Sequence, residues 1–438
     1  MTIMTTHTAG SGLQQSLRGA LGAAGHVQAP IAQQHGEPDA KTATARSVLV
    51  THPALQHSHQ LALALHERHL LQAFWSGVPV ATGDEALPWW LPPRYRQRMR
   101  RVEIPASLRV HPLHFQLMMR ATSKLTVGFG GDRIHRMFHW FDAWAAKRVL
   151  SLRPKTVVAY ENAAYHTFAA AKAVGARCIL DAAAFHHKTV SELLQPADTP
   201  YTSEVNRRKD AEIAMADLIL TCSPLAADSY AANGVSRGRL QPLLLGADPI
   251  QGALNTPPPR KAGPTRFMFA GPLSRRKSVD LIVAAFEQLH AQGLPYELSF
   301  VGGVGDSELL EAVQKTPGAR YRPSVPQAQL FELMAEADCL VLPSRSDSFG
   351  MVVAEAMSCG TPALVSTQTG AKAIVEAFPD SGWIIEPELD ALCAMLRRLI
   401  ADPELLREAR LPAAQASQEF SWERYRNRAG KLFEDFLQ

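Results

Sequence analysis

The most chemically suggestive stretch of the sequence lies between a predicted strand that ends at Leu342 and a predicted helix that begins near Phe349–Gly350. The free N–H groups and the positive dipole at a helix start attract phosphate. Asp347 stands in the loop before that helix, and Glu355 stands about two turns into it. These two acids could flank a bound sugar diphosphate and accept hydrogen bonds from its hydroxyl groups. Gly350 would let the backbone approach such a ligand closely.

Glu355 also has a plainer interpretation, because a glutamate within a helix usually faces solvent and a glycine before a helix is usually only a turn. The neighbours of Glu355 argue against that interpretation. Ala354 and Ala356 flank it, and the apolar segment 351–353 precedes it. An acid in so apolar a helix is poorly placed to face plain solvent, so we favour the binding-site interpretation.

A second candidate phosphate site follows the predicted strand 267–270, which ends at Gly271. The next turn holds three cations before a predicted helix: Arg275, Arg276 and Lys277. Cations oppose the dipole at a helix start, so they fit better as counter-charges to a diphosphate. A solvated basic turn explains them equally well on the residues alone. Gly303, in the glycine-rich segment 301–305, would allow close approach at the end of a third strand.

The rest of the chain predicts the scaffold that positions these residues. Strand-like apolar runs alternate with helical patterns, which is typical of an α/β fold with parallel sheets. Segment 249–265 is rich in proline and glycine and indicates a linker, so we expect a ligand cleft between two domains. The expected order is a disordered leader at 1–45, an N-terminal α/β domain at 46–248, the linker at 249–265, a C-terminal α/β domain at 266–420 and a helix at 421–438 that packs back on the N-terminal domain.

Composition narrows the class of protein. The formal net charge of +4 over 438 residues gives no support to nucleic-acid binding. Five separated cysteines without a C-x-x-C pair argue against a disulfide framework or a zinc site and fit a reducing compartment. No apolar run reaches the roughly 18 residues that span a bilayer. We expect a cytoplasmic protein, at most peripheral on the inner face of the cytoplasmic membrane.

Several motifs occur in a recognisable order: F-M-F-A-G-P-L-S-R-R-K at 267–277, S-F-V-G-G-V-G at 299–305, A-D-C-L-V-L-P-S at 337–344 and D-S-F-G-M-V-V-A-E-A-M at 347–357. Upstream, A-D-L-I-L-T-C-S at 216–223 and G-A-D at 246–248 belong to the same series. Together they resemble the retaining GT-B glycosyltransferases (family 4-like, group 1), which include sucrose and trehalose-phosphate-type synthases and many bacterial polysaccharide glycosyltransferases. The resemblance covers roughly 210–375 and implies the GT-B fold, with two Rossmann-like domains facing a central cleft.

The resemblance also implies roles for single positions. Glu355 matches the acid that holds the ribose hydroxyls of the nucleotide, and Asp347 matches the catalytic acid beside the transferred sugar. Lys277 matches the lysine that neutralises the diphosphate. The amides of Ser348, Phe349 and Gly350 would contact sugar or phosphate, and the backbone at 322–325 would read the base.

This sequence departs from the family pattern at three positions. Asp347 replaces a glutamate, Pro272 replaces an arginine and Ser278 replaces a glycine. Arg275 or Arg276 could supply the cation lost at Pro272. These changes leave the expected fold intact and put the identity of the donor in question.

The N-terminal half offers weaker candidates for the acceptor side. His186 follows a predicted strand where similar enzymes carry a catalytic histidine near the donor sugar, although a lone histidine is as often structural. Glu161 and Asn162 follow another strand end and could bind acceptor hydroxyls, with a solvated loop as the equal alternative. His57 lies in the first loop and is the third candidate for acceptor binding.

A short aromatic and basic segment suggests surface docking. It contains Trp89, Trp90, Arg94, Arg96, Arg98, Arg100 and Arg101. Aromatic residues beside cations suit an anionic membrane or a diphosphate-linked lipid, whereas a solvated basic helix or an RNA-binding patch would look similar. We favour peripheral membrane contact because interfacial tryptophan and arginine recur together.

These inferences predict transfer of a hexose from a nucleotide-diphosphate sugar to a glycan or lipid-linked acceptor in cell-surface polysaccharide synthesis, with retention implied by the resemblance. We expect no cofactor and no metal at the diphosphate, because no D-x-D occurs in the chain. Two alternatives remain open: a nucleotide-sugar epimerase of the same fold, and a donor-binding but inactive subunit.

Overall fold

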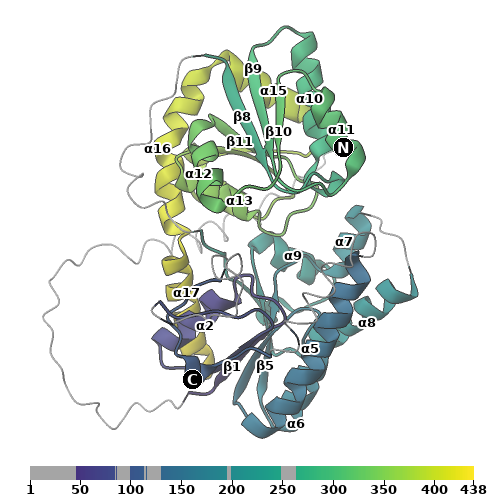
Figure 1. The fold of residues 1–438 in the computed structure, drawn as a ribbon, viewed down its shortest axis with the longest axis vertical. Coiled ribbons are helices and arrows are strands. Elements are labelled where there is room, and N and C mark those ends of the chain that lie inside the picture. The colour runs from purple at the N-terminus through teal and green to yellow at the C-terminus, as the bar shows by residue number, and fades with distance from the viewer. Residues whose placement is uncertain are drawn as a thin grey trace, which may run out of the picture.

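Two α/β domains face each other in the structure, a computed structural model that describes residues 46–83, 85, 99–112, 115, 130–194, 199–247 and 263–438 (Figure 1). The statements below concern those residues. The expected leader at 1–45 and most of the expected linker at 249–265 lie outside them.

The N-terminal domain is built on a parallel sheet, in which the described strands follow the order β3-β2-β1-β4-β5-β6-β7. The strands are β1 Val48–His52, β2 Leu71–Ser76, β3 Arg109–Val110, β4 Thr156–Tyr160, β5 Arg177–Ala182, β6 Leu218–Thr221 and β7 Leu240–Pro242. The chain moves outward from β1 to one side and then restarts at β4 on the other. In such sheets the crevice beyond the carboxyl ends of the two central strands is the usual place for a ligand.

Helices cover both faces of this sheet. They are α2 Ser58–Glu67, α5 Gly130–Leu152, α6 Tyr165–Ala173, α7 His187–Leu194, α8 Pro200–Met215 and α9 Pro224–Ala232. The side chains of β1 alternate between two buried clusters: Val48 and Val50 pack with Leu61 of α2, whereas Leu49 packs in the cluster of Phe141 of α5. Burial on both faces explains why β1 is apolar at successive positions instead of alternating with polar residues.

The C-terminal domain has a second parallel sheet, with its strands in the order β10-β9-β8-β11-β12-β13. They are β8 Thr265–Ala270, β9 Tyr296–Val301, β10 Ala319–Arg322, β11 Cys339–Leu342, β12 Ala363–Ser366 and β13 Gly382–Ile385. The helices are α10 Val279–Ala291, α11 Ser307–Lys315, α12 Gln327–Glu336, α13 Met351–Ser358, α14 Lys372–Ala377, α15 Leu389–Ala401 and α16 Pro403–Glu419. Two parallel-sheet α/β domains confirm the predicted fold class.

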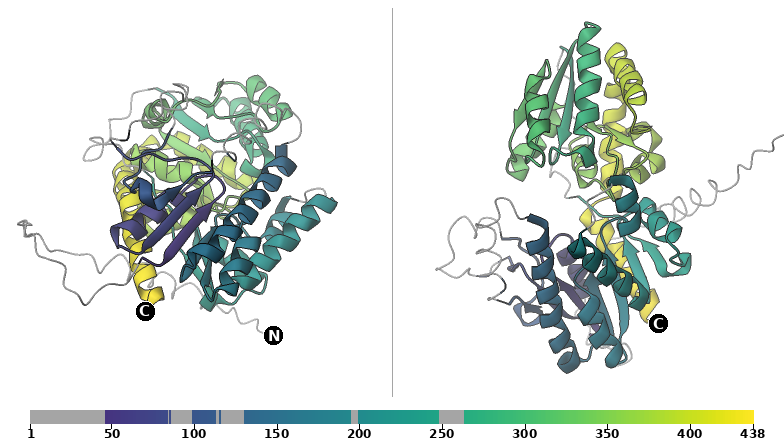
Figure 2. Two further views of the ribbon diagram at one scale, coloured as in Figure 1. Left: turned by 60° about the horizontal axis from the view of Figure 1, so that its bottom comes forward. Right: turned by 90° about the vertical axis from the view of Figure 1, so that its right-hand side faces the viewer.

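The chain returns to the N-terminal domain after α16, through the last helix α17 Trp422–Leu437 (Figure 2). At the crossing, the N–H of Ala247 donates to the carbonyl of Phe420 at 2.9 Å. Further along, α17 lies beside α2, where Arg68 pairs with Glu434 at 2.6 Å and Arg426 donates to Glu67 at 3.0 Å. The C-terminal segment therefore ties the two domains together and brings Trp422 to the space between them.

Candidate active site between the two domains

A cavity of about 840 Å³ lies between the domains and is lined by residues of both. Its volume falls in the range of sites that hold small molecules. The predicted site residues in its lining are His57, Gly271, Lys277, Gly303, Asp347, Ser348, Phe349, Gly350 and Glu355. Ser324 and Val325, from the backbone segment expected to read the base, also line it. The loops that follow β8, β9 and β11 thus meet at one place, as the parallel topology requires.

Lys277 and Asp347 form an ion pair on the C-terminal wall, which is the part of the cavity lining that the C-terminal domain contributes. The Lys277 ammonium contacts the Asp347 carboxylate, and both residues are more than nine-tenths buried. Burial lowers the pKa of Lys277, while the negative charge of Asp347 opposes that shift. A desolvated charge pair at the wall of a cavity places a strong electrostatic field where a charged ligand would bind.

The loops around this pair need unusual backbone conformations. Gly350, which precedes α13, has φ +87°, in the left-handed region that favours glycine. Gly302 comes directly after β9 and packs against the backbone of Gly271. A Cβ at position 302 would lie 1.9 Å from the carbonyl oxygen of Gly271, so only glycine fits there. Ser278, at the start of α10, has φ +57°, which explains why the family pattern has glycine at this position.

Ser348 joins the C-terminal wall to the N-terminal domain. Its hydroxyl donates to the carbonyl of Ala183 at 2.8 Å, and its own carbonyl accepts a hydrogen bond from the hydroxyl of Ser223 at 2.6 Å. Ser223 caps the N-terminus of α9, and Ala183 follows β5. These bonds connect the loop that carries Asp347 to two elements of the opposite domain.

Arg276 supports the site and is not part of its lining as the structure describes it. Its guanidinium donates to the carbonyl of Ser346 at 2.8 Å, and its own carbonyl accepts from the N–H of Arg345 at 3.1 Å. In the structure Arg276 therefore holds the loop before Asp347, and its contact with the donor stays a prediction. Glu355, in contrast, lies on α13 where predicted, half-buried in the cavity wall.

The N-terminal wall is built around a histidine–aspartate pair. His57, at the N-cap of α2, contacts the carboxylate of Asp181 at 3.0 Å through Nε2, and both side chains are buried. Burial by itself lowers the pKa of His57, but the charge and the hydrogen bond of Asp181 outweigh it and raise that pKa above 6.5. His59 also lines the cavity, and burial together with the charge of Arg100 lowers its pKa to about 4.

The sequence draws attention to the loop that contains Gln56 and His59 without assigning them to the site, and it misses Asp181 and Trp422. A signal existed for the first two, because polar residues crowd the loop after β1. Asp181 lies inside β5, where the sequence suggested only a buried strand. Trp422 reaches the cavity through the final helix, and no local pattern predicts that return.

Three predicted residues of the N-terminal half lie elsewhere: His186, Glu161 and Asn162 are absent from the described lining of the cavity. His186 stacks on His187 and packs against Tyr230, and burial with the charge of His187 lowers its pKa to about 4. Glu161 pairs with Lys209 at 3.2 Å. The sequence predicts His186 beside the donor sugar and Glu161 and Asn162 at the acceptor, and none of the three lies in the described lining of this cavity.

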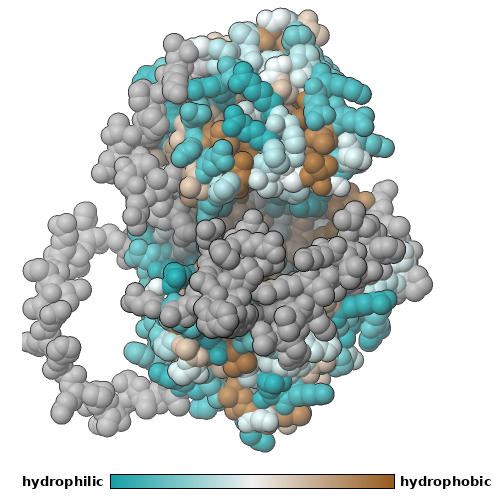
Figure 3. Space-filling model, viewed as in Figure 1, coloured by the Kyte–Doolittle hydropathy of each residue, from teal (hydrophilic) through white to brown (hydrophobic). Residues whose placement is uncertain are grey.

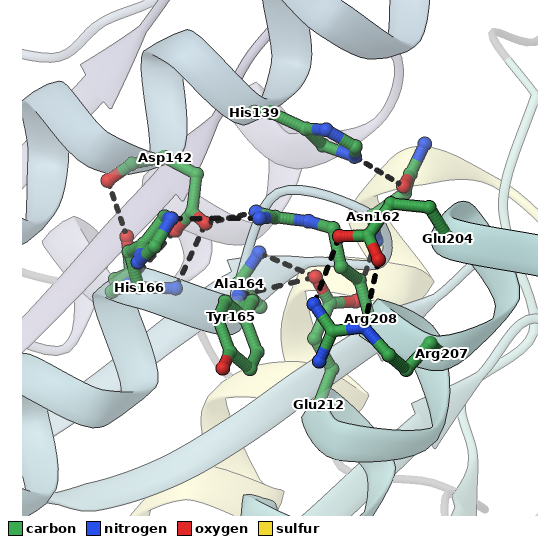
Figure 4. Close-up of polar contacts among 11 residues, drawn as sticks. His139, Asp142, Asn162, Ala164, Tyr165, His166, Glu204, Arg207, Arg208 and Glu212 are labelled. Carbon is green, nitrogen blue, oxygen red and sulfur yellow. Dashed lines mark hydrogen bonds and ion pairs between the residues drawn. The ribbon is translucent and has the colours of Figure 1, made fainter. Parts of the chain in front are cut away.

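The backbone of Asn162 belongs to a network that also holds the start of α6. The buried carboxylate of Glu212 accepts the N–H groups of Asn162, Ala164 and Tyr165 at 2.7, 3.0 and 3.1 Å (Figure 4). Beside it, Asp142 accepts the N–H groups of the next turn at 2.8 Å each and pairs with Arg208 at 2.7 Å. Burial raises the pKa of Glu212 to about 8, although the backbone donors oppose that shift. This network satisfies the first N–H groups of a buried helix.

The segment predicted to contact a membrane is described only in part. Trp89, Trp90, Arg94, Arg96 and Arg98 lie outside the described residues. Arg100 lines the cavity, and Arg101 donates to the carbonyl of Thr82 at 2.9 Å. Within the described ranges, each helix is too short or too polar to cross a bilayer. In the view of Figure 3, hydrophobic residues of the upper, C-terminal domain lie in patches between hydrophilic ones.

Residues 255–415 match the protein family described as "Glycosyl transferases group 1". The C-terminal domain is a group 1 glycosyltransferase domain. Over 170 residues the chain is 34% identical to a D-inositol 3-phosphate glycosyltransferase of Catenulispora acidiphila. The aligned region covers 36% of this chain and 40% of that protein. It is also 29% identical over 163 residues to the O-antigen chain mannosyltransferase B of Escherichia coli. This aligned region covers 36% of this chain and 42% of that protein. The chain therefore matches less than half of the length of these relatives.

Solved structures resemble nearly the whole chain, including the N-terminal half that the family match does not reach. A sucrose-phosphate synthase from Thermosynechococcus elongatus has a TM-score of 0.62 at 16% identity, over 90% of this chain and 99% of that one. The Anabaena protein HepE, in complex with UDP and glucose, has a TM-score of 0.61 at 15% identity, over 89% of this chain and 100% of that one. At such identities the likeness establishes the fold, which is the predicted GT-B fold.

Proposed function

We propose that this chain is a glycosyltransferase that moves a hexose from a nucleotide-diphosphate sugar, bound by the C-terminal wall, to an acceptor held by the N-terminal wall. The observation that carries the proposal is the convergence of Lys277, Asp347 and Glu355 in one interdomain cavity, at the ends of parallel strands. A cation, two acids and helix-start amides form the set that a sugar diphosphate needs. The match of residues 255–415 to group 1 glycosyltransferases supports the same assignment.

In this proposal the C-terminal wall binds the donor and stabilises the leaving group. Glu355 accepts the ribose hydroxyls, Asp347 accepts a hydroxyl of the sugar, and Lys277 contacts the diphosphate. Negative charge grows on the diphosphate as the bond to the sugar breaks, and Lys277 and the amides at the start of α13 meet that charge. These groups supply the positive potential from the protein itself, so the account includes no metal at the diphosphate.

The acceptor hydroxyl binds against His57 on the opposite wall. Asp181 holds Nε2 of His57 at 3.0 Å, which leaves Nδ1 as the nitrogen that takes a proton. The acceptor oxygen forms its bond to the sugar carbon, its proton passes to His57, and the diphosphate leaves with the electron pair of the broken bond. Closing the two domains around this arrangement would exclude water and limit hydrolysis of the donor.

The finer features of the proposal follow the family resemblance. They are retention of configuration at the sugar carbon and a glycan or lipid-linked acceptor of cell-surface polysaccharide synthesis. Peripheral contact with an anionic membrane is proposed from the tryptophan- and arginine-rich segment 89–101. UDP-sugars are the first donors to test, because HepE binds UDP and glucose. Inositol phosphate and O-antigen precursors are the first acceptors to test, because relatives are named for them.

The test begins with UDP-, GDP- and ADP-sugars screened for thermal stabilisation of the full-length protein. The donor that stabilises is then incubated with candidate acceptors, and the products are separated and their anomeric configuration is read by NMR. We expect the sugars of one nucleotide base to raise the melting temperature of the protein. We also expect the sugar to be transferred to an acceptor, with release of the nucleoside diphosphate.

The same assay separates the competing functions. Conversion of the donor sugar without any acceptor would indicate an epimerase. Tight binding of a nucleoside diphosphate with neither transfer nor slow donor hydrolysis would indicate a donor-binding subunit. Failure of every nucleotide sugar to stabilise the protein would contradict the proposal.

A further inference from the structure

A cluster of metal-ligating side chains lies outside the interdomain cavity. His186 and His187 stand at the start of α7, and Asp210 faces them from α8. One ligand atom from each residue lies within 4.8 Å of the other two. Nε2 of His187 is 2.7 Å from Oδ1 of Asp210, and the two imidazole rings stack with centroids 4.5 Å apart.

The chemistry of this donor set favours a particular class of ion. Imidazole nitrogens and a carboxylate suit zinc, nickel and copper, whereas magnesium and calcium prefer oxygen ligands. Zinc takes nitrogen and oxygen ligands at about 2.0–2.2 Å, so ligand atoms around one ion lie roughly 3 Å or a little more apart. Nε2 of His187 lies 2.7 Å from Oδ1 of Asp210, and the ligand atoms of the three residues all lie within 4.8 Å of one another, so the cluster has the size that one ion needs.

We propose that His186, His187 and Asp210 bind one divalent transition-metal ion of the zinc class, with water completing the coordination. The two histidines are buried, whereas the side chain of Asp210 is about half exposed, so the carboxylate lies on the side from which an ion enters. Three protein ligands and an open position form a common zinc arrangement. The proposal concerns this cluster alone and does not depend on the proposed transfer reaction.

The surroundings of the cluster are compatible with a bound cation. Lys209, the neighbour of Asp210 in the sequence, pairs with Glu161 at 3.2 Å, so its charge is already matched. Nδ1 of His186 accepts a long hydrogen bond of 3.3 Å from the N–H of Lys188. A bond of that length is weak, and a metal ion bound at Nδ1 would replace it.

The position of the cluster gives the ion a structural role. It would join the start of α7 to α8, two helices that are neighbours of the loop after β5. That loop contains Ala183, whose carbonyl accepts the hydroxyl of Ser348 from the C-terminal domain. Metal binding would therefore stabilise the segment of the N-terminal domain that meets the loop of Asp347.

Calorimetric titration of Zn²⁺ into the full-length protein tests the proposal, after removal of any histidine tag and of residual metal with a chelator. We expect one ion per chain and a higher melting temperature with Zn²⁺. In a parallel titration, Co²⁺ should give the visible absorption bands of a four-coordinate site. Asp210→Asn and His187→Gln should each weaken binding about tenfold or more, since each removes one ligand.

His186→Asn separates ligation from helix capping. Asparagine is a good N-cap, so this variant should keep the cap of α7 and lose Zn²⁺ binding, while circular dichroism of the metal-free protein checks that it stays folded. His290→Asn on α10 and Asp228→Asn on α9 are matched controls that should bind as the wild type does. No binding by the wild type, or binding by all three cluster variants with the affinity of the wild type, would overturn the proposal.

Discussion

The two walls of the interdomain cavity are assembled in different ways. On the C-terminal wall, the residues that line the cavity come from short loops directly after β8, β9 and β11 and from the helix α13 that follows β11. Each lies close in sequence to the strand that positions it. On the N-terminal wall, His57 follows β1, its partner Asp181 comes from within β5, and Trp422 comes from the last helix of the chain. The first wall is local in sequence and the second is not.

This difference limits the rule that residues following the carboxyl ends of parallel strands face a ligand. Glu161 and Asn162 follow β4, one of the two central strands, and by that rule they should face a ligand. In the structure the N–H of Asn162 donates to the buried carboxylate of Glu212, which also holds the start of α6. The carboxylate of Glu161 pairs with Lys209. A polar residue after a strand is therefore a weaker site candidate where its hydrogen-bonding groups are already bound within the protein, as they are beside the start of α6.

The largest expected effect is on the C-terminal wall. Lys277→Ala should lower kcat/KM by about 10²–10³-fold, because it removes the charge that meets the leaving diphosphate and leaves Asp347 buried and unpaired. Steady-state kinetics with the preferred donor measures the change. Arg275→Ala, a basic residue two positions away that is mostly exposed, is the matched control and should stay within about twofold of the wild type. Equal losses in both variants would break the distinction between site and solvated turn.

The next effect is on stability and belongs to the internal network of the N-terminal domain. Glu212→Gln should destabilise the fold by about 2–3 kcal/mol, because one amide oxygen cannot accept three backbone N–H groups and the amide NH₂ would face donors. Urea unfolding measures the change. The folded variant should keep its KM for the acceptor, and a raised acceptor KM without loss of stability would place this network in the acceptor site after all.

A smaller effect is expected in the pH dependence of the N-terminal wall. In the wild type, kcat/KM should rise with pH through the raised pKa of His57, because the neutral imidazole takes the proton. Asp181→Asn removes the charge that raises this pKa and keeps the burial that lowers it. The acidic limb should therefore move to lower pH by on the order of one unit. A limb that stays in place would exclude His57 as the titrating group.

The same pair predicts a stability difference with a defined sign. A histidine whose pKa is raised by folding stabilises the folded state below pH 6.5, and that contribution is lost as pH rises through the folded pKa. The stability gap between the wild type and Asp181→Asn should therefore be largest in acid and shrink toward alkaline pH. A gap that widens with pH would contradict this account of the pair.

The smallest effect is expected at Asn162, which has φ +70°. Asn162→Gly keeps that backbone conformation available and should change the free energy of unfolding by less than about 1 kcal/mol. The acceptor KM should change by less than about twofold, because the residue lies outside the described cavity lining. A large rise in acceptor KM would return Asn162 to the acceptor site.

Sequence reasoning reaches the fold and the C-terminal wall because the physics there is local. A buried strand that ends in glycine before a helix predicts both the sheet and the anion-binding loop, and Asp347, Lys277 and Gly350 lie where this pattern places them. Sequence alone does not distinguish Lys277 from Arg276, because consecutive cations in one turn look alike. The structure sends one into the cavity and the other to the carbonyl of Ser346.

The N-terminal wall could not be predicted in the same way because its parts meet only after folding. Nothing near His57 in the sequence indicates that Asp181 will face it across the sheet, and nothing near Trp422 indicates that α17 returns to the first domain. The metal-ligand cluster is similar, because Asp210 lies on a different helix from His186 and His187. Long-range pairs of this kind depend on topology, which the local pattern constrains but does not specify.

The measurement that tests the central claim most directly is calorimetric titration of UDP, GDP and ADP into the wild type, Glu355→Ala and Glu376→Ala. Glu355 lines the cavity, whereas Glu376 lies exposed on α14 and serves as the control. We predict that one nucleoside diphosphate binds the wild type and the control with equal affinity and binds Glu355→Ala about tenfold or more weakly. Equal binding by all three proteins, or no binding of any nucleoside diphosphate to the wild type, would contradict the assignment of this cavity as the donor site.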